Sequence, residues 1–118
     1  MSFHFCSQTW EVRDTPDGTL VKLTPRNLNQ EALAVLVDEL FDLVQESGQP
    51  NLSLDFTEIR AVTSVILGKM LALDAKLRQH GGRLILLNTD SFVYQKFDVT
   101  RLTKILDVRQ TEATGFVA

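Results

Sequence analysis

The amino-acid sequence predicts an α/β fold with a mixed β-sheet of about four to five strands and helices packed mainly on one face. A hairpin signal and a strand–helix–strand unit lead to this prediction. Pro16-Asp17-Gly18 separates two strand-like stretches, and an Asp-Gly dipeptide supplies the positive φ of a tight hairpin. Two apolar strand segments, 52–56 and 83–88, flank an amphipathic helix, which is the pattern of a right-handed parallel crossover. An antiparallel hairpin beside a parallel pair makes the sheet mixed.

The first half of the chain supplies the hairpin and one helix. We expect strands at 9–13 and 19–23, one on each side of the turn. From Asn29 onward apolar residues recur at helical spacing, with Asn29 as a cap and Gly48 as a stop before Pro50. The helix therefore buries one stripe, which consists of Leu33, Leu36, Val37, Leu40, Phe41 and Val44.

The two central strands differ in pattern. In the strand 52–56 the Leu and Phe side chains share one face, while Ser53 and Asp55 point to the other face. The strand 83–88 is too apolar for an exposed edge, so we expect it to be buried and parallel to the first. Asp55 then stands near the carboxyl end of its strand.

The helix between these strands begins with two hydroxyl side chains. It runs from about Thr63 to His80, where Gly81-Gly82 ends it, and its inward row is Ile66, Met70, Leu73 and Leu77. A phosphoryl group on Thr63 or Ser64 would be stabilised there, because the first N–H groups of a helix lack partners and the dipole is positive. Alternatively, one hydroxyl only caps the helix, which contributes about 1 kcal/mol. Gly68 indicates close approach of another backbone, from this domain or from a partner.

The C-terminal part is predicted from its capping residues. Asp90 or Ser91 can cap a short third helix that runs to residue 97, and a further turn follows at 100–105. A final strand can begin at Val108. No repeat or linker interrupts this order in the 118 residues, so we expect a single domain over residues 1–118.

Composition excludes two classes of partner. The 12 basic and 15 acidic residues give a net charge of −3, and no long run of like charges occurs. We therefore expect no nucleic acid and no membrane insertion, since the apolar stretches are far shorter than the ~20 residues that span a bilayer. The first residues lack a signal-type apolar run with a basic flank, which predicts a cytoplasmic protein.

Residues for catalysis or metal binding are not found in the sequence. The glycines spell neither a dinucleotide fingerprint nor a P-loop, and Cys6 has no Cys or His neighbour at ligand spacing. His80 stands at a helix end, where it most simply acts as a cap. Asp55 and Glu58 are a candidate carboxylate pair, but no further polar group in the sequence completes an acid–base site with them. We expect no catalytic residue, no metal and no cofactor, and hence no enzyme.

Four segments together resemble a known family. Residues 55–59 read Asp-Phe-Thr-Glu-Ile, like a D-[LF]-[ST]-x-[VI] element, and residues 63–68 resemble a following D-S-S-G-L-G. Residues 81–88 are similar to G-G-x-L-x-L-x-N, and residues 97–106 are similar to F-x-[LI]-[ST]-G-L-x-x-[LI]-[FL]. These are motifs of STAS domains, the anti-sigma factor antagonist fold. The chain therefore resembles a single STAS-like domain.

The resemblance implies a partner switch regulated by phosphorylation. Aligned on the Leu-Gly pair, Ser64 stands where phosphorylatable members carry the regulatory serine, and Thr63 is the alternative acceptor. The unmodified domain would bind an anti-sigma factor or related GHKL-type Ser/Thr kinase, phosphorylation would release it, and a phosphatase would reverse the modification. The partner-binding surface expected on this basis consists of Asp55, Thr63, Ser64 and Lys69.

Two other functions are compatible with the same fold. Thr63, Val65 and Ile66 depart from the family motif, which favours a constitutive STAS binding or scaffold module without phosphorylation. Lipid or small-ligand transport would require an apolar cavity. Labelling by a Ser/Thr kinase distinguishes the switch from the scaffold.

Overall fold

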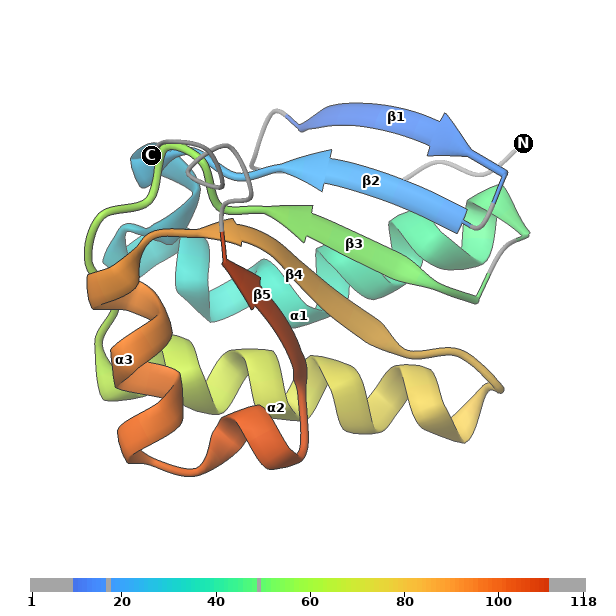
Figure 1. Ribbon diagram of the computed structural model, residues 1–118. Helices are drawn as coiled ribbons and strands as arrows, with labels where there is room; N and C mark the ends of the chain where they lie inside the picture. The colour runs from blue at the N-terminus through green and yellow to red at the C-terminus, as the bar shows by residue number, and fades with distance from the viewer. Residues whose placement is uncertain (1–9, 17, 49, 111–118) are drawn as a thin grey trace.

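The computed structural model describes residues 10–16, 18–48 and 50–110. In these residues, three α-helices, two short 3-10 helices and five strands follow one another (Figure 1). Their order is β1 (Glu11–Thr15), β2 (Gly18–Lys22), η1 (Pro25–Leu28), α1 (Gln30–Ser47), β3 (Leu52–Asp55), α2 (Ser64–Gln79), β4 (Leu84–Thr89), α3 (Ser91–Val99), η2 (Leu102–Lys104) and β5 (Asp107–Gln110). The predicted alternation of strands and helices is confirmed.

The strands form one mixed sheet in the order β1-β2-β3-β4-β5. β1 pairs with β2 in the antiparallel direction, whereas the other three pairs are parallel. The helices α1, α2 and α3 lie in the connections between successive parallel strands. The predicted parallel pairing of the two central strands is therefore correct, and all the parallel strands end at the same edge of the sheet.

The core lies between the sheet and the helices α1 and α2, which cover one face (Figure 1). Val21, Leu54 and Leu86 contribute buried side chains from neighbouring strands, and they pack with buried residues of both helices. α3 packs beside β4 and β5. On the opposite face of the sheet Leu20, Ser53 and Ile85 are in register and half-buried, and no helix of the described residues covers them. The helices are thus mainly on one face, as predicted.

Capping residues set the bounds of the helices. The Asn29 side chain accepts a hydrogen bond from the Ala32 N–H at 2.8 Å, and α1 ends at Gly48, whose φ is 78°. Thr63 and Asp90 cap α2 and α3 in the same way. Asn29 and Gly48 are the caps that the sequence predicted, and Thr63 and Asp90 are each one of the two alternatives that it left open.

The hairpin is displaced from its predicted position. β1 was expected at 9–13, of which residue 9 lies outside the described residues, but the strand runs from Glu11 to Thr15. The pairing of β1 with β2 extends as far as Thr15 and Gly18. A Cβ at Gly18 would collide with the carbonyl oxygen of Asn51, which accepts a hydrogen bond from the Thr19 N–H at 3.1 Å. Gly18 is therefore needed for the close approach of β2 to the residue before β3.

Acidic residues are concentrated on α1, which contains no Lys or Arg. Asp38 is paired with Lys76 of α2 at 3.4 Å, and Glu39 is buried. The helix carries Glu31, Asp38, Glu39, Asp42 and Glu46. A large share of the acidic residues of the domain therefore lies on one element.

Candidate functional site

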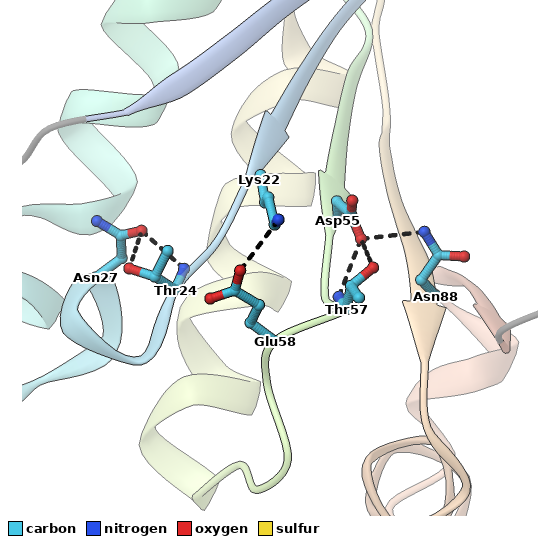
Figure 2. A network of polar contacts seen from close by, with 7 residues as sticks. All are labelled: Lys22, Thr24, Asn27, Asp55, Thr57, Glu58 and Asn88. Carbon is cyan, nitrogen blue, oxygen red and sulfur yellow. Dashed lines mark hydrogen bonds and ion pairs between the residues drawn. The ribbon is translucent and has the colours of Figure 1, made fainter.

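Polar side chains form a network at the carboxyl ends of β3 and β4 (Figure 2). Asp55 ends β3, and its Oδ1 accepts hydrogen bonds from the Thr57 N–H at 2.9 Å and from the Thr57 hydroxyl. The same oxygen accepts a hydrogen bond from Asn88 Nδ2 of β4 at 3.0 Å. Asp55 therefore ties two strand ends together and fixes the start of the connection from β3 to α2.

Asn88 reaches Asp55 from an uncommon backbone conformation. Its φ is 59°, in the left-handed region, which Asn tolerates better than most residues other than Gly. The pairing of β4 with β5 shifts register between Leu86 and Thr89, on either side of Asn88. This irregularity occurs at the position where the Asn88 amide is hydrogen-bonded to the carboxylate of the neighbouring strand.

The charges beside the network are paired. Lys22 Nζ lies 3.0 Å from Glu58 Oε2, so the end of β2 is linked to the connection that follows β3 (Figure 2). The hydrogen bond with Glu58 and its charge raise the pKa of Lys22. Partial burial alone would raise the pKa of Asp55, but hydrogen bonds from Thr57 and Asn88 outweigh it and hold the pKa below the usual 3.8. Asp55 is therefore a carboxylate at neutral pH.

The connection from β3 carries the chain around this end of the molecule to α2 (Figure 1). Ile59 and Val62 are buried and anchor it to the core. Thr63 caps α2, and its hydroxyl oxygen accepts a hydrogen bond from the Ile66 N–H at 3.3 Å. Ser64 is the first residue of α2 and is exposed, and within the described part of the chain its hydroxyl has no hydrogen-bond partner. The two adjacent hydroxyls therefore differ in what they do.

Small and apolar residues lie on the exposed side of the first turns of α2, next to Ser64. Val65 is 56% exposed, and a Cβ added to Gly68 would meet no described atom within 4 Å. Close approach to Gly68 by another described part of the domain, one of the two expectations, is therefore wrong, while approach by a partner stays a prediction. Gly68 lies one turn after Ser64 on the same side of the helix. Lys69 is half-buried and lies about 140° around the helix axis from Ser64.

The structure thus divides the predicted partner-binding surface. Thr63 and Ser64 are adjacent at the start of α2, Asp55 is engaged at the strand ends, and Lys69 points away from Ser64. In the part of the chain that the structure describes, no group of His, Cys, Asp and Glu could hold a metal ion. Cys6 lies outside the described residues. Among those residues no helix has the length and apolar character that crossing a membrane requires.

Comparison with known proteins places the chain in a family. Its sequence matches the STAS domain over residues 7–115. The chain belongs to the STAS domain family. Extension of the domain to all of residues 1–118 stays a prediction. A search among curated proteins finds no match to this STAS domain.

Solved structures share the fold of this STAS domain. The NMR structure of the protein TM1081 superposes with a TM-score of 0.79 at 18% identity, over 96% of this chain and 90% of that chain. A crystal structure from Thermotoga maritima, named "putative anti-sigma factor antagonist (tm1081)", gives a TM-score of 0.72 at 17% identity over 90% of each chain. At these identities the likeness shows the fold alone.

Thr57 and Asn88 are site residues that sequence reasoning did not single out. Both stand at fixed positions of the family motifs, the [ST] after Asp55 and the Asn that ends the strand motif. The hydrogen bonds to Asp55 give these motif positions a structural reason, because they hold together the two strand ends from which the connection to α2 departs. The motif match itself was the signal that could have found them.

Proposed function

We propose that this STAS domain is a non-enzymatic partner-switching protein of the anti-sigma factor antagonist kind, regulated by phosphorylation of Ser64. The observation that carries the proposal is the difference between two adjacent hydroxyls. Thr63 accepts the Ile66 N–H, whereas the exposed Ser64 hydroxyl has no partner among the described residues. A kinase can therefore modify Ser64 without removing the helix cap. The STAS family is generally non-enzymatic, and the name of the Thermotoga protein agrees with the proposed role.

Phosphate on Ser64 would act at the surface of the domain. It adds about −1.5 to −2 charges beside Val65, which is 56% exposed, and one turn from Gly68. A partner that covers this small apolar surface would have to desolvate the phosphate, and a loss of ~3 kcal/mol weakens binding roughly a hundredfold. The helix dipole stabilises the phosphate by only about 0.3–1 kcal/mol. Phosphorylation therefore changes the stability of the domain little, and the fold itself needs no rearrangement.

The remaining residues of the predicted surface have supporting parts. Asp55 keeps the connection before α2 in place through Thr57 and Asn88, so it acts as a positioning residue. Lys69 would contact a partner at the margin of the surface. The partner in this proposal is an anti-sigma factor or related GHKL-type Ser/Thr kinase in the cytoplasm, and a phosphatase restores the free hydroxyl. Thr63 is the less suitable acceptor, because its oxygen already serves as the cap.

Phosphorylation with defined kinases tests the proposal. The purified chain is incubated with candidate GHKL-type kinases and ATP, and the phosphate is located by mass spectrometry in the wild type, Ser64→Ala and Thr63→Ala. Ser91→Ala is the matched control, because Ser91 is also an exposed first residue of a helix, behind the cap Asp90. Label that is lost only in Ser64→Ala supports the switch.

Two results would contradict the proposal. Label on Thr63 would move the acceptor by one residue and give the cap itself the regulatory role. No label from the kinase that binds the protein would favour the constitutive scaffold module. Binding of that partner to Ser64→Glu, measured by calorimetry, provides the second readout, and the expected loss is roughly a hundredfold.

A further inference from the structure

A groove lies between the connection to α2 and the helix α3. Its volume is about 490 Å³. The connection and α3 contribute one side each, and the lining includes Arg60, Ala61, Val62, Phe92, Lys96 and Val99. The groove therefore begins three residues before Thr63 but does not contain Ser64.

The α3 side of the groove presents apolar residues to solvent. Phe92 is 75% exposed and Val99 is 72% exposed, although both are large apolar side chains. α3 already fills its core positions with Val93 and Phe97, which are fully buried. Positions 92, 96 and 99 are spaced so that their side chains lie along one side of a helix. Phe92 and Val99 thus form a second apolar stripe that the core does not use.

The charged side chains that line the groove are basic. Arg60 and Lys96 line it, and within the described residues neither forms an ion pair. The nearest acidic residues along the chain are not in the lining: Asp90, the N-cap of α3, accepts the Val93 N–H at 2.9 Å, and Asp98 accepts the Thr103 hydroxyl at 3.2 Å. In a chain with a net charge of −3, the charged side chains that line this groove are both basic. A ligand that matches the groove in chemistry is an apolar side chain with acidic side chains beside it.

We propose that the groove docks a segment of a partner protein in which large apolar side chains are flanked by Asp or Glu, as in an acidic amphipathic helix. The apolar side chains would cover Phe92 and Val99, and the carboxylates would pair with Arg60 and Lys96. A volume of 490 Å³ lies in the range of about 300–1,000 Å³ that is common for binding pockets. This inference goes beyond the proposed switch, because no step of it involves Ser64.

Peptide titrations monitored by NMR test the docking groove on the full chain. The probe is a synthetic helical peptide with Leu and Phe along one side and Glu on both flanks. Two control peptides carry Lys in place of Glu or Ala in place of the apolar residues. The acidic apolar peptide should shift the backbone amide signals of Phe92, Lys96 and Val99 in a saturable way. The shifts should shrink when salt is raised from about 50 to about 300 mM, because exposed ion pairs are screened.

Matched variants identify the groove as the binding site. Phe92→Ser and Val99→Ser should each raise the Kd at least about tenfold, and Lys96→Glu about three- to tenfold. All three side chains are exposed, so the fold should persist, as the dispersion of the amide signals will report. Ile105→Ser removes another exposed apolar side chain outside the groove lining, and Arg13→Glu makes the same kind of charge change on β1. Neither control variant should alter the Kd.

Four outcomes overturn the proposal. The first is that the groove signals do not shift at millimolar peptide. The second is equal binding of the Lys-flanked peptide, which would leave only non-specific apolar contact. The third is that the groove signals of the free chain depend on protein concentration, which would assign the groove to a second copy of this chain. The fourth is that phosphatidylglycerol vesicles bind at the groove and displace the peptide, which would assign it to a lipid surface. Phosphorylation of Ser64 affects none of these readouts directly, so this test and that of the switch can fail independently.

Discussion

Replacing Gly68 with Ala should stabilise the folded domain. Gly68 is the fifth residue of a helix that runs from Ser64 to Gln79, so it occupies an interior position. Ala is better than Gly there by about 0.8–1.0 kcal/mol, because it loses less backbone freedom on folding. A steric cost would reduce this gain, but an added Cβ meets no described atom within 4 Å. The free energy of unfolding should therefore rise by about 0.5–1 kcal/mol, and Tm by about 2–4 °C.

Urea denaturation followed by circular dichroism measures this change. The midpoint should rise while the slope stays constant, because the folded and unfolded states expose the same surface as before. Gly82→Ala is the control, since a Cβ at Gly82 would overlap the carbonyl oxygen of Pro50, and this variant should lose more than about 2 kcal/mol. A loss of stability in Gly68→Ala would refute the reasoning, because the added methyl group would then clash with atoms beside Gly68. If a partner covers this side of α2, the same variant should bind it more weakly although the domain is more stable.

Three further predictions concern the caps and carboxylates. Thr63→Ala should lower the free energy of unfolding by about 1 kcal/mol, whereas Ser64→Ala should change it by less than about 0.5 kcal/mol; equal losses in urea denaturation would contradict their different roles. The pKa of Asp55 in the folded state lies below its value of 3.8 in the unfolded chain, so its contribution is complete above that value and is lost as the pH falls through the lowered pKa. Between about pH 6 and about pH 2, stability should therefore fall less steeply in Asp55→Asn than in the wild type, and parallel curves would show that the carboxylate is not stabilised. Asp74 is buried and accepts the Leu84 N–H at 3.0 Å, so Asp74→Ala should cost about 1–3 kcal/mol by thermal unfolding, and an unchanged Tm would mean that water satisfies this donor.

Local chemistry explains why the helices were predictable. Asn29, Thr63 and Asp90 each combine a short side-chain acceptor with an apolar pattern that follows, and a cap needs only the residues of its own turn. Gly48 stops α1 for an equally local reason, its φ of 78°. Of the two central strands, β4 was predictable because its apolar content excludes an exposed edge, and β3 because its apolar side chains alternate with Ser53 and Asp55.

The candidate site was predictable only where it is local. Ser64 and Thr63 follow from the start of one helix, but the bond between Asp55 and Asn88 joins strands 33 residues apart and depends on their register. Apolar periodicity assigns side chains to a core, so it could not show that Phe92 and Val99 stay outside while Val93 and Phe97 go inside. The observed hairpin differs from the predicted one because Gly18 lies close to Asn51, and that contact depends on a strand that comes later in the chain.

The uneven distribution of charge gives the molecule an electric dipole. α1 carries five acidic residues, Glu31, Asp38, Glu39, Asp42 and Glu46, while Arg60 and Lys96 stand unpaired among the described residues at the groove beside α3. A field of this kind turns a charged molecule during diffusion, before any contact is made, and it raises the rate of productive encounters. An acidic binding partner would be repelled by α1 and attracted to the groove beside α3. It would therefore approach the domain in the orientation in which it binds. The association rate constant should then fall as the ionic strength is raised, and it should change more than the lifetime of the complex does.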